Sequence, residues 1–457
     1  MFPKDFRWGS ATAAIQIEGA ASADRKGPSV WDTFCRVHPE RIHQQATPEI
    51  ACDHYHRYAD DVRLIGQLGH NAYRFSISWP RVLPQGSGWV NPAGLDFYDK
   101  LVDALCQTGI SPNATLYHWD LPEALGILGG WENPRTVDAY LEFAELCFDR
   151  LGDRVDYWCT FNEPAWSLLN GYITALHPPC RHDPAAAVLA SHHIMLAHHL
   201  AHHLYTGPGK VGMALNLSPI YPATDQSDDI KAARIADGVL NRWFLEALVE
   251  GRYPDEVVAH YDRRGILPAG YATLSGSRPG FIGVNYYYPH HAVAPPQHNE
   301  FHLNNDGNPN DKCRFSLAGC FAFVANNRGR FTDWNWEIHP ESLEKLLLDL
   351  HERWPGLELL VTENGLGLPD EPGPNGVDDQ PRIDFVSEHL RAIAGALKAG
   401  VKVGGYYMWS LMDNFSWING YKKRYGFLYV DRETMQRTPK KSADWYRRLI
   451  QENRLPG

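Results

Sequence analysis

The feature that most constrains the fold of this chain is an alternation between short apolar runs and longer segments with helical periodicity. The segment 382–399, for example, carries Ile383, Val386, Leu390, Ile393 and Leu397 on one face of an expected helix. Eight apolar or aromatic runs bounded by turn residues predict β-strands at residues 6–11, 71–78, 110–118, 156–162, 210–217, 281–287, 358–362 and 404–410. Parallel strands joined by crossover helices close naturally into a barrel when eight of them follow one another. The sequence therefore predicts an α/β fold, a (β/α)8 TIM barrel.

The domain organisation follows from the absence of linkers. The chain has 457 residues, enough for about three domains of ordinary size, but α/β barrels reach this length through insertions in their loops. No stretch rich in Pro, Gly and Ser divides the chain, and two polar stretches, 295–312 and 367–381, follow expected strand ends. We expect a single barrel domain over residues 1–457, with elaborated loops at its C-terminal face.

Charge and hydropathy exclude several classes of protein. The formal net charge of −11 leaves no basic surface for nucleic acid, so a small neutral or polar partner is expected. No window approaches the about 18 consecutive apolar residues of a membrane span, and the start MFPKDFRWGSATAA does not read as a secretory signal. The eight cysteines form no CxxC pair and are expected to be free thiols. We expect a cytoplasmic protein that binds neither nucleic acid nor membranes.

Two glutamates stand at the ends of expected strands, where a TIM barrel carries its functional groups. The fourth run ends in Asn162-Glu163 and the seventh in Glu363-Asn364. A carboxylate directly after an apolar strand is costly unless it is hydrogen-bonded or catalytic. Two such carboxylates suit glycosidic bond cleavage, in which one carboxylic acid protonates the leaving oxygen while the other, ionised, attacks the anomeric carbon. The alternative is a pair of structural carboxylates in ion pairs.

Residue types at other strand ends favour the catalytic interpretation. The second run carries Arg74, whose buried guanidinium would hold a nearby glutamate ionised, and the sixth offers Asn285 and Tyr287 as hydrogen-bond donors. Indole faces stack on the apolar faces of sugar rings, while polar side chains satisfy sugar hydroxyls. Residues of these kinds at the ends of the third and eighth runs are His118, Trp119, Trp409, Ser416 and Trp417.

The sequence resembles glycoside hydrolase family 1 over almost its whole length. The resemblance rests on many motifs in the family's order, among them FPKDFRWGSATAAIQIEGA, NAYRFSISWPRVLP, LYHWDLP, TFNEP, FIGVNYY, VTENG, MWSLMDNFSWINGYKKRYGFLYVD and PKKSADWY. It implies a retaining β-glycosidase with Glu163 as the general acid/base and Glu363 as the nucleophile. It also implies sugar contacts from Gln16, His118, Asn162, Trp409 and Trp417, support of the nucleophile by Arg74, Asn285 and Tyr287, and a platform for the leaving group at Trp336.

Departures from the family pattern bear on the substrate. Ordinary β-glucosidases of the family carry Glu in DNFEW, which holds the 4- and 6-hydroxyls of the sugar, whereas this chain has Ser416. Ser416, Lys423 and Tyr425 match the phosphate-binding triad of the 6-phospho-β-glycosidase branch, and an ammonium with two hydroxyls suits a dianion. The motifs HWD and NEP, in contrast, are typical of plain β-glucosidases. Ile15 replaces the family's Tyr beside Gln16.

We therefore expect an exo-acting retaining β-glycosidase, and first of all a β-glucosidase that tolerates β-fucosides and β-galactosides. Its substrates would be small β-glycosides such as cellobiose or aryl glucosides. The alternative is a 6-phospho-β-galactosidase or 6-phospho-β-glucosidase. A non-catalytic sugar-binding barrel is a remote alternative, because such a protein would be expected to have lost one of the two glutamates.

A histidine-rich segment has the spacing of a metal site. In SHHIMLAHHLAHHLY, His198 with His202 and His199 with His203 have the i,i+4 spacing of helical metal ligands. No acidic or cysteine ligand follows, and the apolar positions between the histidines predict a helix that faces the core. Glycine-rich nucleotide fingerprints do not occur. We expect no metal and no cofactor.

Overall fold

The computed structural model describes residues 2–272, 274, 276–302, 304, 307–308, 310–326, 329–374 and 376–455. Eight strands in parallel pairs form a closed barrel, in the order β1-β15-β14-β7-β5-β4-β3-β2. These are β1 (Arg7–Ala11), β2 (Ala72–Ser76), β3 (Ser111–Tyr117), β4 (Tyr157–Asn162), β5 (Lys210–Asn216), β7 (Phe281–Asn285), β14 (Leu359–Asn364) and β15 (Val403–Trp409). Each overlaps one of the eight runs identified in the sequence. The TIM barrel is confirmed.

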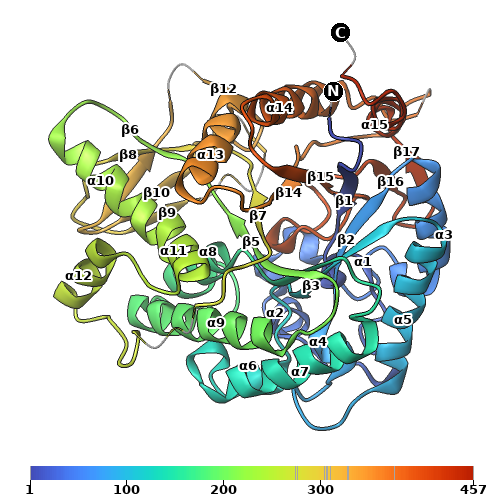
Figure 1. Cartoon of the computed structure of the whole chain (residues 1–457), viewed down its shortest axis with the longest axis horizontal. Helices are drawn as coiled ribbons and strands as arrows, with labels where there is room; N and C mark the ends of the chain where they lie inside the picture. The colour runs from blue at the N-terminus through green and yellow to red at the C-terminus, as the bar shows by residue number, and fades with distance from the viewer. Residues whose placement is uncertain are drawn as a thin grey trace.

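Helices surround the barrel on the connections between its strands (Figure 1). The longer ones are α2 (Val30–Val37), α3 (His54–Gln67), α5 (Pro92–Gln107), α7 (Arg135–Leu151), α9 (Pro184–Leu204), α10 (Ser227–Asp237), α11 (Trp243–Glu250), α12 (Asp255–Arg263), α13 (Pro340–Arg353), α14 (Gln380–Lys398) and α15 (Lys441–Glu452). Short α-helices are α1 (Ala14–Ile17), α4 (Trp79–Val82), α6 (Glu123–Ile127) and α8 (Pro164–Leu168). Single turns of 3-10 helix are η1 (Ala23–Arg25), η2 (Pro39–Arg41), η3 (His43–Gln45), η4 (Gly130–Glu132) and η7 (Trp417–Asn419), and η5 (Leu169–Ile173) and η6 (Gly238–Arg242) are π-helical.

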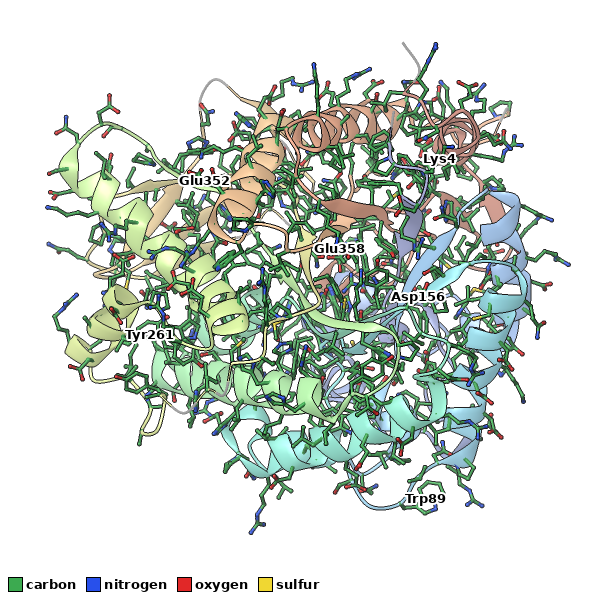
Figure 2. All side chains as sticks on the ribbon, viewed as in Figure 1. Lys4, Trp89, Asp156, Tyr261, Glu352 and Glu358 are labelled. Atoms are coloured by element: carbon green, nitrogen blue, oxygen red, sulfur yellow. The ribbon has the colours of Figure 1, made fainter. Side chains whose placement is uncertain are left out.

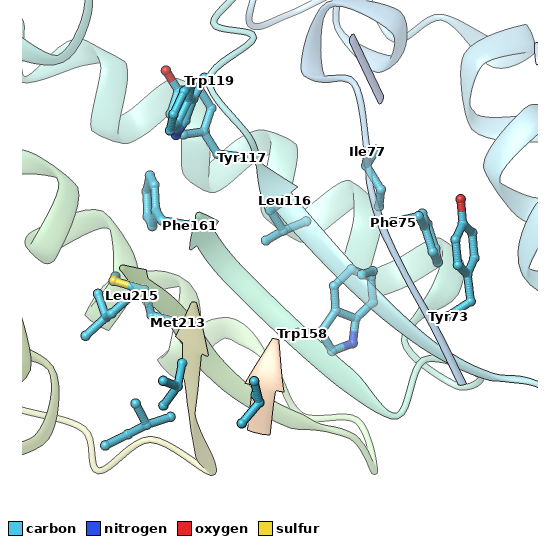
Figure 3. Packing of buried hydrophobic residues seen from close by; sticks show 14 of the residues in the cluster. Tyr73, Phe75, Ile77, Leu116, Tyr117, Trp119, Trp158, Phe161, Met213 and Leu215 are labelled. Atoms are coloured by element: carbon cyan, nitrogen blue, oxygen red, sulfur yellow. The ribbon is translucent and has the colours of Figure 1, made fainter. Parts of the chain in front are cut away.

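Side chains alternate between the inside of the barrel and the layer between strands and helices. Along β4, Tyr157 packs against Phe281 inside the barrel, with 5.3 Å between ring centroids. The next residue, Trp158, faces the other way and packs against Phe148 of α7 at 5.0 Å. Figure 3 shows this outer layer in close-up, where apolar side chains of neighbouring strands lie beside one another. Burial of both faces explains why the barrel strands are nearly continuous apolar runs.

An accessory sheet lies beside the barrel, at the left of Figure 1. Its strands, in spatial order, are β6 (Ile220–Pro222), β8 (His290–Val293), β11 (Phe321–Val324), β10 (Arg314–Leu317) and β9 (Glu300–His302). Two-stranded sheets are formed by β12 (Arg330–Phe331) with β13 (Glu337–Ile338) and by β16 (Leu428–Val430) with β17 (Arg437–Pro439). The polar stretch 295–312, interpreted from the sequence as a rim loop, contains β9; its residues 303, 305, 306 and 309 lie outside the described residues, as does 375 of the second stretch.

One apolar cluster of buried residues extends from Phe2 to Leu449 and so links nearly the whole length of the chain. This continuity supports the prediction of a single domain over residues 1–457. No helix within the described residues is both long enough and apolar enough to cross a bilayer.

Candidate active site

A cavity of about 250 Å3 opens at the ends of the barrel strands, and most of the residues singled out in the sequence meet there. Those that line it are Gln16, His118, Trp119, Glu163, Tyr287, Trp336, Glu363, Trp409, Ser416, Trp417, Lys423 and Tyr425. The remaining three, Arg74, Asn162 and Asn285, are buried directly behind the two glutamates. Residues from strands far apart in the chain are brought together because all parallel strands of a barrel end at the same rim.

Glu363 is held by a cation and a phenol. Its Oε1 accepts a hydrogen bond of 2.6 Å from Arg74, and its Oε2 accepts one of 2.8 Å from the Tyr287 hydroxyl. Arg74 is fully buried and also donates to Asn162 Oδ1 at 2.6 Å. A buried guanidinium needs an anion beside it, so this contact favours the ionised form of Glu363.

Glu163 has a different environment, made of amides. Its Oε1 accepts hydrogen bonds from Asn285 Nδ2 at 2.9 Å and from Asn216 Nδ2 at 3.2 Å. Asn285 Nδ2 also lies 3.0 Å from Asn162 Oδ1, the same atom that accepts a hydrogen bond from Arg74. A chain of hydrogen bonds therefore connects the two glutamates. Glu163 adopts a left-handed backbone with φ of 48° immediately before α8. Non-glycine residues seldom adopt this conformation, and it is concentrated at functional sites.

The two strands that carry the glutamates both lose their regular register at this point. Pairing between β4 and β5 shifts between Cys159 and Asn162, and pairing of β14 with both of its neighbours shifts after Val361. In β14, Thr362 donates to Asn285 and the next residue, Glu363, bonds to Arg74, so two successive side chains face the barrel interior. Strict alternation would have turned Glu363 toward the helices. The register shift therefore delivers this carboxylate to the cavity.

The two carboxyl groups have different affinities for a proton. Burial, and then the negative charge of Glu363, raise the pKa of Glu163 to about 8. Burial also raises the pKa of Glu363, but Arg74 in direct contact opposes this effect by stabilising the carboxylate, as does Tyr287. Because Glu363 has the cation and Glu163 has amides, Glu363 loses its proton first. Near neutral pH the pair holds one ionised carboxylate and one carboxylic acid.

Neutral polar atoms without partners face the same region. Gln16 donates to the carbonyl of Phe415 at 2.7 Å, which leaves its Oε1 buried and without a hydrogen bond among the described residues. The same is true of His118 Nδ1 and Asn419 Oδ1. Burial lowers the pKa of His118 well below its usual range, so its imidazole is neutral. Buried polar atoms are normally paired, and these are placed to bind the hydroxyls of a ligand.

Indole rings form the apolar walls. Trp119 stacks on Trp417 at 4.7 Å between ring centroids, and Trp409 stacks on His118 at 5.8 Å. On another side Trp336 lies nearly parallel to Tyr288 at 5.1 Å. A cavity with flat aromatic faces and hydroxyl-binding atoms matches the two surfaces of a pyranose ring.

Lys423, Ser416 and Tyr425 all line this cavity, as their common motif suggested. The Lys423 side chain is buried, and its Nζ lies 3.5 Å from the ring centroid of Trp336 and 4.8 Å from that of Trp334. No carboxylate pairs with it among the described residues. Burial lowers the pKa of Lys423 well below its usual range.

Sequence reasoning missed Asn216, which contacts Glu163, and Asn419, which carries an unpaired oxygen. Asn216 is the last residue of β5, so the strand-end rule that identified the glutamates also applied to it. Asn419 follows the eighth strand in a 3-10 turn. Accessory segments add Tyr288 and Trp334 to the lining. Nothing in their local sequence distinguishes them from ordinary buried aromatics.

The histidine-rich segment lies on α9 and serves packing. His198 contacts the Thr160 hydroxyl at 2.7 Å, and His199 contacts the carbonyl of Ala247 at 2.9 Å. Burial lowers the pKa of both histidines. Within the described ranges no group of three or more His, Cys, Asp or Glu side chains is arranged to hold a metal ion.

Known proteins resemble this chain from end to end. The family model described as glycosyl hydrolase family 1 matches residues 1–455. Relatives include β-glucosidase A of Acetivibrio thermocellus and an aryl-phospho-β-D-glucosidase of Bacillus subtilis, each 40% identical over 99% of this chain and 98% of the relative. Among solved structures, a family 1 β-glucosidase from Thermotoga maritima has a TM-score of 0.91 at 37% identity, covering 100% of this chain and 99% of that chain. The chain therefore belongs to glycosyl hydrolase family 1 and is a hydrolytic β-glycosidase.

Proposed function

We propose that the enzyme hydrolyses β-glycosides with retention of configuration, with Glu363 as the nucleophile and Glu163 as the general acid/base. Ionised Glu363 attacks the anomeric carbon while protonated Glu163 gives its proton to the departing oxygen, and a glycosyl-enzyme ester forms. Glu163, now ionised, then takes a proton from water, whose oxygen attacks the anomeric carbon and releases Glu363. The observation that carries the assignment is the difference in contacts: Glu363 is paired with Arg74, and Glu163 with amides.

The substrate that the cavity supports best is a neutral β-glycoside, first of all a β-glucoside, with tolerance for β-fucosides and β-galactosides. Three neutral polar atoms without partners, on Gln16, His118 and Asn419, suit hydroxyls. Lys423 is desolvated between indole rings, and burial favours the loss of the charge that a phosphate would need. Ser416 leaves the 4- and 6-positions without a carboxylate. Solved relatives include a Thermotoga maritima β-glucosidase in complex with castanospermine.

A 6-phosphorylated sugar is the second candidate. It is favoured by the meeting of Ser416, Lys423 and Tyr425 at one cavity and by relatives named for 6-phospho substrates, such as a 6-phospho-β-galactosidase of Clostridium acetobutylicum that is 38% identical. A dianion bound there would also raise the pKa of Lys423 again and restore its charge.

Azide rescue tests the roles of the two glutamates. With an activated aryl glycoside, azide should restore turnover of Glu363→Ala as the α-glycosyl azide, because the small anion replaces the nucleophile and inverts the centre once. For Glu163→Ala, azide should restore turnover with the β-glycosyl azide as the product, because the ester still forms on Glu363 and azide then inverts the centre a second time. Glu358→Ala, which removes another buried glutamate of the barrel, is the matched control and should keep its turnover without azide. Azides of the same anomeric form from both variants would refute the assignment.

Parallel assays of the wild type decide the substrate class. The nitrophenyl β-glucoside, β-galactoside and β-fucoside are compared with their available 6-phosphates. A kcat/KM at least about a hundredfold higher for a phosphorylated sugar, roughly the gain from one good charge-assisted contact, would favour the second candidate. For a neutral substrate, Ser416→Glu should raise the preference for glucoside over 6-deoxy fucoside, since the glucoside alone has a 6-hydroxyl for the new carboxylate.

A further inference from the structure

A second cavity, of about 100 Å3, lies outside the barrel where the accessory sheet meets α8, α9, α11 and α12. It follows a seam between two apolar clusters. On one side are residues of the main cluster, such as Trp243 and Tyr261, and on the other is Phe321 of the small cluster around α10 and the sheet. Tyr261, labelled in Figure 2, lies at the left of the view, beside the position of α12 in Figure 1. The cavity lies where the side chains of the two clusters do not pack fully against each other.

The lining is mostly apolar and selects against hydroxyl-rich molecules. Its polar side chains are largely engaged: the Ser191 hydroxyl donates to the carbonyl of Val188 and accepts from Trp243 Nε1, and His260 Nε2 contacts Cys320 Sγ at 3.5 Å. Tyr261 is buried on the wall, and its hydroxyl has no hydrogen bond within the described residues. Arg264, an exposed residue, also borders the cavity, and it donates to the carbonyl of Ala318 at 3.4 Å. A ligand here would meet mainly apolar surface, one free hydroxyl and the side chain of Arg264.

The size of the cavity admits at most one ring. Apolar cavities of roughly 150 Å3 stay dry and bind benzene. The present cavity is somewhat smaller and is bordered by chain segments that are not regular α-helix. Both π-helical turns of the described chain, η5 with Leu169 and η6 with Leu240, contribute to its wall. Such turns are rare and often mark functional sites.

The chain segment that follows Glu163 lines the second cavity as well. The helix α8 starts at Pro164, directly after Glu163, and its residues Ala165 and Leu168 form part of the second cavity's wall. Leu169, the next residue, lines both cavities. A molecule that displaced this segment would move the backbone that carries Glu163.

We propose that the second cavity binds a small neutral molecule with one aromatic or alicyclic ring and at most one hydroxyl, and that its occupation alters the rate of glycoside hydrolysis through α8 and η5. Toluene and phenol have the required chemistry, and glycerol does not. Affinities on the order of a millimolar are expected for ligands with so few atoms.

Filling the cavity tests the proposal. Ala187 of α9 is half-buried on its wall, and Ala185 of the same helix is exposed and does not line it. Binding of toluene and of phenol is measured by ligand-observed NMR in the wild type, Ala187→Phe and Ala185→Phe, with circular dichroism to verify folding. We expect the wild type and Ala185→Phe to bind alike and Ala187→Phe to bind at least tenfold more weakly. Leu240→Trp, a half-exposed wall position, gives a second variant should Ala187→Phe not fold.

The kinetic readout separates this site from the catalytic cavity. At millimolar toluene, kcat/KM for a nitrophenyl glycoside should change at least twofold in the wild type and Ala185→Phe and stay constant in Ala187→Phe. Equal binding in all three proteins, or binding of glycerol as strong as that of toluene, would overturn the site. Loss of binding in Ala187→Phe without any kinetic effect in the wild type would overturn the coupling. The NMR measurement needs no turnover, so its outcome does not depend on the substrate proposed above.

Discussion

Two buried glutamates at the two ends of β14 have different electrostatic environments. Glu358, just before the strand, accepts a hydrogen bond of 2.9 Å from the Tyr157 hydroxyl, is paired with Lys210 and lies 3.7 Å from Lys402 Nζ. Glu363, at the other end, shares its environment with a second carboxyl group and one guanidinium. Figure 2 labels Glu358 near the centre of the view. Because Glu358 precedes the first residue of β14, it lies at the barrel end away from the cavity.

The difference shows how one strand serves stability at one end and chemistry at the other. At the Glu358 end, two lysines and a phenol compensate one carboxylate, and both lysines reach solvent. At the Glu363 end, two carboxyl groups share one buried cation, so one of them must keep a proton. Opposite charges at the first end stabilise the barrel. At the second end one cation serves two carboxyl groups, and the proton that remains is the one that the proposed mechanism requires.

The largest effect that separates the two ends should be on activity. Glu363→Gln should lower kcat on unactivated substrates by on the order of 10^4-fold or more, because the glycosyl ester of the proposed mechanism cannot form. Glu358→Gln should leave kcat/KM within about twofold, since it lies at the barrel end away from the cavity. Steady-state kinetics on both variants measure this contrast. Comparable losses in the two would remove the distinction between the ends.

The second prediction concerns how the free energy of unfolding depends on pH at the Glu163 site. Because burial and Glu363 raise the pKa of Glu163 from 4.5 to about 8, the folded protein holds a proton that the unfolded chain releases between these values. The free energy of unfolding contributed by this group is present below pH 4.5 and declines as pH rises through 8. Glu163→Gln should therefore gain stability relative to the wild type, by on the order of 3 kcal/mol between pH 5 and pH 9.

Urea unfolding at several pH values follows this gain. Glu358→Gln, studied in parallel, controls for the loss of any buried glutamate and should show no comparable gain at alkaline pH. Curves for Glu163→Gln and wild type that stay parallel from pH 5 to pH 9 would contradict the proton held by Glu163.

At the stabilising end the effect is smaller and of opposite sign. Glu358→Gln leaves Lys210 and Lys402 without their carboxylate, and we expect a loss of about 1–2 kcal/mol in the free energy of unfolding at neutral pH, since both lysines remain partly hydrated. Thermal or urea unfolding measures it. An unchanged or higher stability would show that these contacts do not support the barrel.

The smallest effect sharpens the description of the catalytic end. Asn216 donates a hydrogen bond to Glu163, which favours the ionised form and lowers the pKa of that carboxyl. Asn216→Ala should therefore raise this pKa and move the basic limb of the kcat/KM profile to higher pH, because the proposed mechanism requires protonated Glu163. Asn170→Ala, which removes another amide of the cavity wall, is the matched control. A basic limb that moved to lower pH would contradict the role of this amide.

Much of the site could be predicted because its residues obey a simple positional rule. Glu163, Glu363 and Arg74 stand on or directly after apolar runs, and the sequence order of the motifs identifies the rest. The contacts between them were less accessible. Asn285, expected to support Glu363, favours the ionised form of that carboxyl group and also donates hydrogen bonds to Glu163 and Asn162. Pairings of this kind join residues more than a hundred positions apart, and no local pattern encodes them.

By itself the sequence determined the eight strands and the set of side chains at their ends, since burial on both faces demands continuous apolar runs and a barrel gathers their ends at one rim. Only the tertiary structure decided which way Glu363 faces. Alternation along β14 would direct it outward, and the register shift against both neighbouring strands turns it inward to Arg74. The tertiary structure also determines whether Glu163 keeps its proton, because the pKa of Glu163 depends on burial and on the charge of Glu363, which another strand brings near. Both are properties of neighbours in space, and a chain specifies those only when it folds.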